Sequence, residues 1–335
     1  MAWEDVKAIF RPETVHMGQM AIDKESCTKC DLCMENCPFR CWEKDEEGYP
    51  RLKQSYACFS CFNCKVACPV DAISIVETYH VHEGFWATSP KPLPVKMPQE
   101  PRDAEGKLTE WTVVERLMLE RRSVRNYRDK PVPESLIRRV LEAGRFAPSA
   151  GNCQPWKFVV VTDKALIKEM DEIIINGLSG VYNMYMNDDM VKMLAGVYES
   201  NPAQGPGSYD PRLAIGGMGS IANRYGPPFL NAPVVILIAG DARAIGGAQI
   251  NVGICGENMN LAALALGLGA CWVGFSQVLN MAPQIMEKLG LQPPWSIISS
   301  IVLGYPRFRQ QGMVPREFRP ITWFREGSSG PETEE

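Results

Sequence analysis

Apolar residues recur with two different periods in the second part of the chain, and these periods predict helices alternating with strands. Apolar side chains three and four residues apart indicate helices, whereas short unbroken apolar runs indicate buried strands. Helices are predicted over residues 111–122, from Pro133 through Leu141, and over 250–266. Strands are predicted over 158–161, 233–239 and 297–303. Because helices separate the strands, we expect an α+β or α/β layer fold over 108–325.

A proline-rich segment separates this part from the cysteine-rich residues that precede it. Residues 87–105 contain five prolines, which forbid a regular helix and favour an extended, semi-rigid segment. We therefore expect a cysteine-rich domain over 1–86, a linker over 87–107, the layered domain over 108–325 and an acidic tail over 326–335. The tail is polar and contains glycine and serine, so we expect it to lack regular structure.

Length, charge and cysteine usage narrow the class of protein. The 335 residues suffice for about two domains, and 45% of them are apolar. A net charge of −4 offers no basic surface to nucleic acid, and no apolar stretch approaches the ~20 residues of a membrane span. We therefore expect no nucleic-acid partner and no membrane span. The chain opens without an apolar signal sequence, and nine of its 12 cysteines precede residue 69, so we expect a reducing, cytoplasmic location.

Eight of the cysteines form two matching runs that each end in proline. Both runs read C-x2-C-x2-C-x3-C-P, and the second follows the first by 31 residues. This spacing is typical of bacterial iron–sulfur ligation, because closely spaced thiolates reach several corners of one cluster. A disulfide framework would instead suit a small secreted domain, and zinc sites lack the third cysteine two residues further on. The runs consist of Cys27, Cys30, Cys33 and Cys37, and of Cys58, Cys61, Cys64 and Cys68.

Residues 18–78 resemble the two-cluster bacterial ferredoxins. The resemblance implies two 4Fe–4S clusters with crossed fourth ligands, since the distal cysteine of each run serves the other cluster. One cluster would take Cys27, Cys30, Cys33 and Cys68. The other would take Cys58, Cys61, Cys64 and Cys37. Cys41 lies outside the pattern, and we expect a buried thiol there, with a modified cluster as the alternative.

Further motifs follow in the second domain. Residues 121–125 read Arg-Arg-Ser-Val-Arg and place three guanidiniums and a hydroxyl together, which suits bidentate binding of a phosphate. Capping of the preceding helix end is the alternative interpretation. A rigid loop with two prolines and a glycine follows at 147–158. The remaining motifs are a glycine-rich turn at 267–275, Gly-Tyr-Pro at 304–306 and Pro-Arg-Glu-Phe-Arg at 315–319.

Together these motifs resemble the flavin-dependent nitroreductase family over residues 110–322. The resemblance implies an α+β fold with a central mixed or antiparallel sheet, and FMN at the interface of an intertwined homodimer. Phosphate and ribityl contacts would come from Arg121, Ser123 and Arg125, from Arg122 through its backbone, and from Arg316 or Arg319. From the partner subunit, Pro148, Ser149, Ala150, Asn152 and Gln154 would reach the isoalloxazine. Along its other edge would pass Cys271, Trp272, Val273 and Gly274.

Two features of this domain bear on the chemistry near the flavin. Many family members carry an acidic residue where Val273 stands, so hydrogen bonding near the flavin N5 would run through the backbone here. Residues 173–230 are rich in methionine and tyrosine and match the region that covers the flavin in nitroreductase-like proteins. Such side chains suit a flat substrate, although core packing is the alternative. The candidate proton donors to a reduced substrate are Tyr182, Tyr185 and Tyr198.

The two domains together predict a cytoplasmic FMN- and iron–sulfur-dependent oxidoreductase. Electrons from an external donor, either a ferredoxin-like protein or NAD(P)H, would pass through the clusters to FMN and on to a small organic acceptor. A nitroaromatic, quinone, activated alkene or halogenated ring would serve as the acceptor. Two alternatives stay open: oxidation of a substrate in the reverse direction, and a non-catalytic redox sensor or electron-transfer protein.

Overall fold

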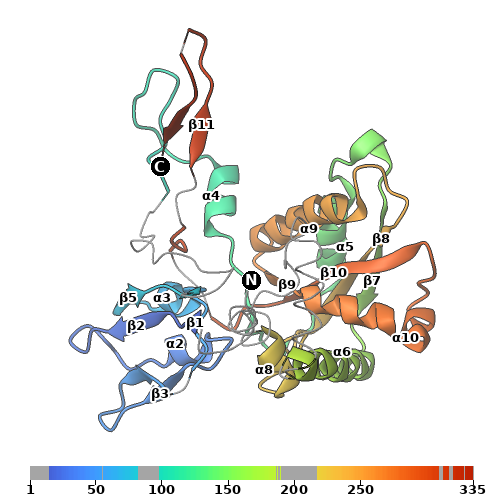
Figure 1. The fold of residues 1–335 in the computed structure, drawn as a ribbon, viewed down its shortest axis with the longest axis horizontal. Coiled ribbons are helices and arrows are strands. Elements are labelled where there is room, and N and C mark those ends of the chain that lie inside the picture. The colour runs from blue at the N-terminus through green and yellow to red at the C-terminus, as the bar shows by residue number, and fades with distance from the viewer. Residues whose placement is uncertain are drawn as a thin grey trace.

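The computed structural model describes residues 15–54, 56–81, 98–185, 187, 189, 217–308, 312–316, 320–327 and 329–334. A small domain that holds the two cysteine runs lies beside a larger one (Figure 1). Within the described ranges, no helix is long and apolar enough to cross a membrane.

Within its described residues, the small domain has two short helices and three antiparallel strand pairs. The helices are α2 (Leu32–Glu35) and α3 (Asn63–Ala67), one in each cysteine run. The strand pairs are β1 (Val15–His16) with β6 (His80–Val81), β2 (Gln19–Ile22) with β5 (Ile73–Glu77), and β3 (Trp42–Lys44) with β4 (Pro50–Leu52). Only a few apolar side chains are buried here, and Cys33, Cys41 and Cys64 are among them. A core this small suits a domain that metal ligands hold together.

The 31-residue sequence repeat is also a repeat of backbone conformation. Left-handed residues with positive φ occur in pairs that are 31 positions apart, and such residues sharply redirect the chain. The pairs are Lys29 and Ser60, Asp31 and Phe62, and Arg40 and Asp71. Each cysteine run therefore folds around its helix in the same way.

A four-stranded antiparallel sheet forms the centre of the larger domain. Its order is β7 (Trp156–Val161), β8 (Val234–Asp241), β10 (Trp295–Gly304) and β9 (Gly269–Trp272). The three strands predicted from apolar runs are confirmed as β7, β8 and β10. The glycine-rich motif at 267–275, predicted as a turn, in contrast contains β9. At this edge Ser123 adds a parallel bridge to Ala270.

Strand β8 shows why these strands appear as unbroken apolar runs. Successive side chains of a strand point to opposite faces of the sheet. Val235 and Leu237 enter one hydrophobic core, and Ile236 and Ile238 enter the other. Because both faces are covered, β8 has no polar side chain before Asp241 at its end.

Helices cover both faces of the sheet (Figure 1). One core contains α6 (Lys164–Tyr185), α8 (Met218–Ala222), α10 (Pro283–Lys288) and the 3-10 segment η6 (Gly274–Met281). The other contains α5 (Glu134–Arg145) and α9 (Ala248–Ala265). Two further elements are α4 (Val113–Glu120) and the 3-10 segment η2 (Ala150–Asn152). The predicted helices over 111–122, from Pro133, and over 250–266 are confirmed as α4, α5 and α9.

Two segments next to the larger domain differ from the sequence predictions. The acidic tail does not lack regular structure, because β12 (Glu332–Glu334) pairs with β11 (Ile321–Trp323) and Arg325 contacts Glu332. This hairpin and α4 extend away from the body of the molecule (Figure 1). The linker is not extended throughout either, because Arg102 pairs with Leu108 across a tight turn. Its residues 87–97 lie outside the described ranges.

Candidate functional site

Four thiols from both cysteine runs gather around α2. Cys33 lies on this helix and is buried, and burial raises the pKa of its thiol to about 12. The nearby groups of Cys30, Cys27 and Cys68 contribute to this rise. Cys68 belongs to the second run, so the structure brings together the four cysteines that the crossed arrangement assigns to one cluster.

A second group of four thiols gathers around α3. Burial raises the pKa of Cys64 well above its ordinary value, and the thiols of Cys61, Cys58 and Cys37 raise it further. Here Cys37 is the residue that comes from the other run. All twelve cysteines of the chain are free, so neither group is joined by disulfides. Eight soft thiol ligands in two groups of four fit two iron–sulfur clusters.

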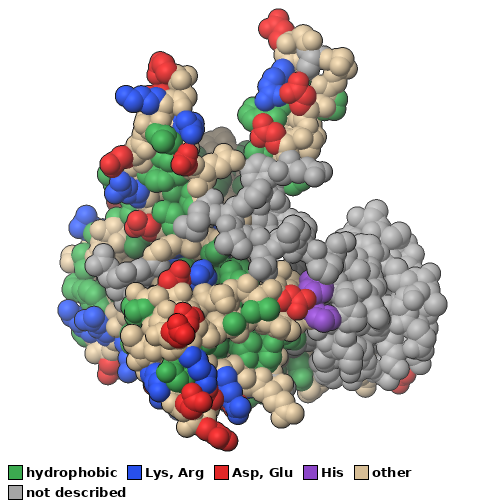
Figure 2. Space-filling model, turned by 90° about the vertical axis from the view of Figure 1, so that its left-hand side faces the viewer, with side chains coloured by type: hydrophobic (Ala, Val, Ile, Leu, Met, Phe, Trp, Pro, Cys, Tyr) green, Lys and Arg blue, Asp and Glu red, His purple; other side chains and the backbone are tan. Residues whose placement is uncertain are grey.

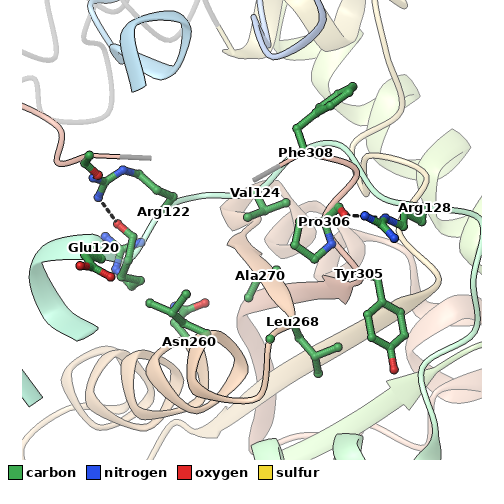
Figure 3. A pocket seen from close by; sticks show the side chains of 15 residues that line it. Glu120, Arg122, Val124, Arg128, Asn260, Leu268, Ala270, Tyr305, Pro306 and Phe308 are labelled. Carbon is green, nitrogen blue, oxygen red and sulfur yellow. Dashed lines mark hydrogen bonds between the residues drawn. The ribbon is translucent and has the colours of Figure 1, made fainter. Parts of the chain in front are cut away.

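A cation-lined cavity of about 790 Å³ lies where α4, β9 and the segment after β10 meet (Figure 3). The Arg122 guanidinium projects from one end of it, and Arg128 and Tyr305 lie at the other. Arg122 donates to the carbonyls of Leu119, Arg121 and Gly312. Its buried Nε has no hydrogen-bond partner among the described residues.

The charge around Arg122 favours an anion. Burial, together with the positive charges of Arg316 and Arg121, lowers the pKa of its guanidinium to about 10. An anion near this guanidinium would offset the repulsion among these positive charges and would accept a hydrogen bond from the unpartnered Nε. The capping interpretation also holds in part, because Arg122 donates to the Leu119 carbonyl at the end of α4. Arg319, the other candidate cation at this end of the chain, lies outside the described residues.

Arg121 has a carboxylate partner that the sequence analysis does not identify. Its Nε lies 2.8 Å from Oε1 of Glu257 on α9. Oε2 of the same carboxylate accepts hydrogen bonds from the Trp272 ring at 3.4 Å and from Asn260 at 3.1 Å. Glu257 therefore ties α4, α9 and β9 together. The sequence does mark this residue, because Glu257 is the only charged residue within 250–266.

Residues 123–126 run between β9 and the small domain. On one side, the Val124 amide donates to the Ala270 carbonyl at 2.9 Å. On the other, the Asn126 side chain donates to the Glu35 carbonyl of α2 at 2.5 Å. Burial raises the pKa of Cys61, while the Asn63 amide and the charge of Arg125 oppose that rise. Arg125 is thus close enough to Cys61 to act on a candidate cluster ligand.

Two side chains of the predicted flavin motif at 271–274 point into the protein core. Cys271 and Val273 are buried in the core beneath the sheet. The Val273 amide donates to the Ser300 carbonyl at 2.8 Å, and the Val273 carbonyl accepts from the Ser276 and Ser300 hydroxyls. Its backbone is therefore already engaged. Gly274 differs, because a Cβ placed there would meet no atom within 4 Å.

The loop at 148–154 is held by its own hydrogen bonds and lies largely exposed. The Gln154 amide donates to the Ser149 hydroxyl at 2.9 Å, and the Gln154 side chain donates to Asn152 at 3.2 Å. The Ala150 amide donates to Asn251 of α9 at 3.3 Å. Pro148, Asn152 and Gln154 are exposed. These contacts fix the shape of the loop without covering it.

The three candidate tyrosines are only partly described. Tyr182 lies on α6 and packs against the core that contains this helix. The side chain of Tyr185 and all of Tyr198 lie outside the described residues. No proton donor is assigned from this set.

Two protein families match the chain. The model of the nitroreductase family matches residues 118–305, and that of a 4Fe-4S dicluster domain matches residues 19–69. A putative NADH dehydrogenase/NAD(P)H nitroreductase of Methanothermobacter thermautotrophicus is 26% identical over 205 residues, which cover 60% of this chain and 81% of that protein. An NADH dehydrogenase of Thermus thermophilus is 56% identical over 54 residues, which cover 16% of this chain and 26% of that protein.

The chain is also similar to solved structures. A nitroreductase with bound FMN from Desulfitobacterium hafniense aligns with a TM-score of 0.46 and 23% identity. The alignment covers 62% of this chain and 96% of that one.

Proposed function

The chain belongs to the nitroreductase family, and we propose on this basis that it is a cytoplasmic, FMN- and iron–sulfur-dependent oxidoreductase. In this proposal electrons from an external donor pass through two 4Fe–4S clusters to FMN and reduce a small organic acceptor. When bound, the clusters would supply one-electron transfer and FMN would supply the exchange between one- and two-electron chemistry. The protein contributes ligands, orientation and charge.

Both cofactors fit the side chains that would hold them. The clusters would be held by Cys27, Cys30, Cys33 and Cys68, and by Cys37, Cys58, Cys61 and Cys64. For FMN, the crowded guanidiniums of Arg122 and Arg316 suit the phosphate, with Ser123 and Arg125 beside them. Arg121 acts mainly by holding Glu257, since this ion pair occupies its Nε. Gly274 offers an open backbone position for the flavin edge.

One observation carries the proposal: the same short segment borders both candidate sites. Arg125 and Ser123 belong to the predicted flavin motif, and the charge of Arg125 acts on Cys61 of the second thiol group. The neighbouring Asn126 bonds directly to the small domain. This arrangement supports electron transfer between the two sites within one chain.

An anaerobic titration followed by flavin absorbance tests the proposed function. Reduced ferredoxin or NAD(P)H should bleach the flavin, and an acceptor of the right class should restore its colour while being consumed. Nitroaromatics, quinones, activated alkenes and halogenated rings are the acceptors to compare. A substrate that bleaches the flavin without any donor would reverse the proposed direction. Bleaching without turnover of any acceptor would favour a sensor.

Replacement of Arg316 by glutamine should weaken FMN binding by about tenfold or more, because a hydrogen bond to a charged group contributes roughly 1.5–3 kcal/mol. Arg316 is exposed, so its loss should leave the fold intact. Equilibrium dialysis of the released flavin measures the change. Arg128→Gln is the matched control, since Arg128 lines the cavity at the end opposite Arg122. An unchanged FMN affinity in the Arg316 variant would place the phosphate elsewhere.

We further propose that the protein is a homodimer, because α9 and α4 expose large apolar side chains. Apolar residues lie on nearly every side of α9, which is typical of a buried helix. Yet Ile250 is 66% exposed and Ile254 is also exposed. Val113 on α4 is 76% exposed, and Phe146 after α5 is 71% exposed. An exposed apolar surface next to the loop at 148–154 suits a partner subunit.

Replacement of Ile250 by glutamate should convert the dimer to a monomer and lower FMN retention with it. A buried unpaired carboxylate would oppose association strongly, whereas the same residue costs little on an exposed surface. Light scattering coupled to size-exclusion chromatography gives the mass. Val76→Glu on β5, also an exposed apolar position, should leave the mass unchanged. A monomeric wild-type protein that retains FMN would contradict the homodimer.

A further inference from the structure

The internal repeat gives Cys41 a counterpart that is not a cysteine. Cys41 follows Cys37 by four residues, and Ala72 follows Cys68 by four residues. The two positions are equivalent in the backbone as well. The Cys41 amide donates to the Cys37 sulfur at 3.3 Å, and the Ala72 amide donates to the Cys68 sulfur at 3.2 Å. Each thiol group thus receives one such backbone hydrogen bond, and the Cys41 side chain is an addition on one side only.

The Cys41 thiol lies against the second group of cluster ligands. It is 2% exposed, packs with Cys37 and Cys58 in the core of the small domain, and lies close enough to both of their sulfurs for hydrogen bonding, which raises the pKa of the Cys41 thiol. In the other group the methyl of Ala72 stands in this place, and a methyl donates no hydrogen bond. The two candidate clusters therefore have the same ligand types but different hydrogen bonding to their sulfurs.

Hydrogen bonds to cluster sulfurs are among the factors that set the reduction potential. A donor stabilises negative charge on a sulfur, and a reduced cluster carries one more negative charge than an oxidised one. The group with the extra thiol also includes Cys61, the cysteine on which the charge of Arg125 acts. The extra donor thus lies at the cluster site that faces the flavin motif.

We propose that the Cys41 thiol donates a hydrogen bond to a ligand sulfur of the cluster held by Cys37, Cys58, Cys61 and Cys64, and so raises the reduction potential of that cluster above that of the other. This inference rests on the proposed function, because it requires both clusters. Electrons that enter at the cluster of Cys27, Cys30, Cys33 and Cys68 then move to the cluster nearer Arg125. Cys41 is a tuning residue and not a ligand.

Two substitutions in the full-length, cluster-loaded protein test this inference. Cys41→Ala copies the residue of the other repeat and removes the donor, while Cys41→Ser keeps a donor of similar size. Anaerobic redox titration followed by electron paramagnetic resonance gives the potential of each cluster. Cys41→Ala should lower one of the two potentials, with up to about a tenfold change in the oxidised-to-reduced ratio, or ~59 mV for a one-electron couple. Cys41→Ser should restore most of this shift.

The control and the contrary outcomes separate tuning from other roles. Cys255→Ala removes a buried thiol in the larger domain and should move neither potential. Loss of iron from Cys41→Ala would make Cys41 a ligand and overturn the inference, as would full iron content with both potentials unchanged or equally shifted. Absence of iron and sulfide in the wild-type protein would instead reject the proposed function itself.

Discussion

Replacement of Cys30 by alanine is expected to abolish turnover with reduced ferredoxin while sparing reduction by small artificial donors that reach the flavin directly. Cys30 is an exposed member of the first thiol group, so removing it takes away a proposed cluster ligand without opening a cavity in the core. The ferredoxin-driven rate should fall by more than ~100-fold. Substitution of a residue that only supports a metal ligand lowers activity by up to that factor, and here the proposed ligand itself is removed. Steady-state rates with the two kinds of donor measure the difference.

The ratio of the two rates distinguishes electron delivery by the small domain from a purely structural role. Cys153→Ala, at an exposed cysteine of the larger domain, is the matched control and should change neither rate. Equal loss with both kinds of donor in the Cys30 variant would mean that the small domain only supports the structure. Retained ferredoxin-driven turnover would mean that electrons enter without the cluster bound by Cys30.

Paired substitutions of the cysteines should reveal the crossed ligands. Cys30→Ser and Cys68→Ser should each remove one cluster, and the double variant should lose no more iron than either single one, because both residues would hold the same cluster. Cys61→Ser combined with Cys68→Ser should remove both clusters, since these residues would hold different ones. Iron analysis of the anaerobically purified proteins should therefore give about half and about none of the wild-type content, respectively.

The uncrossed arrangement makes the opposite prediction. If each run held its own cluster, Cys30→Ser with Cys68→Ser would lose all iron and Cys61→Ser with Cys68→Ser would lose half. Circular dichroism separates ligand loss from unfolding, and the larger domain should keep its signal in all variants. The neighbouring thiols of Cys68 around Cys33, and of Cys37 around Cys64, favour the crossed result.

The elements that the sequence predicts are those whose burial is visible in their own residues. β8 and β10 contain long apolar runs because both faces of the sheet are covered, and α9 is rich in apolar residues because it packs on that sheet. β9 gives no such signal. It has only four residues and begins with a glycine, and its extended state depends on pairing with β10. The β11–β12 hairpin depends in the same way on a contact between remote residues.

In the candidate site, too, some features follow from the local sequence and others only from packing. The motif at 121–125 predicts a cationic site, because three guanidiniums stand together in the chain itself. Packing of the folded chain decides what each arginine contacts. Arg121 pairs with Glu257, whereas Arg122 lies near other cations. The side chains of Cys271 and Val273 face the core for the same reason, and the Val273 backbone is already hydrogen-bonded, so Gly274 is the open position of that motif.

By itself, the sequence indicated the chemistry that we propose for this protein, because cysteine spacing and arginine clustering are local properties of a chain. It predicted two iron–sulfur sites, a cationic site after the first helix and two domains. The tertiary structure alone decided which groups of the two domains face each other. Arg125 near Cys61, and Cys41 against Cys37 and Cys58, result from segments that meet only when the chain is packed. Such contacts depend on the summed packing of many residues and leave no periodic trace along the sequence.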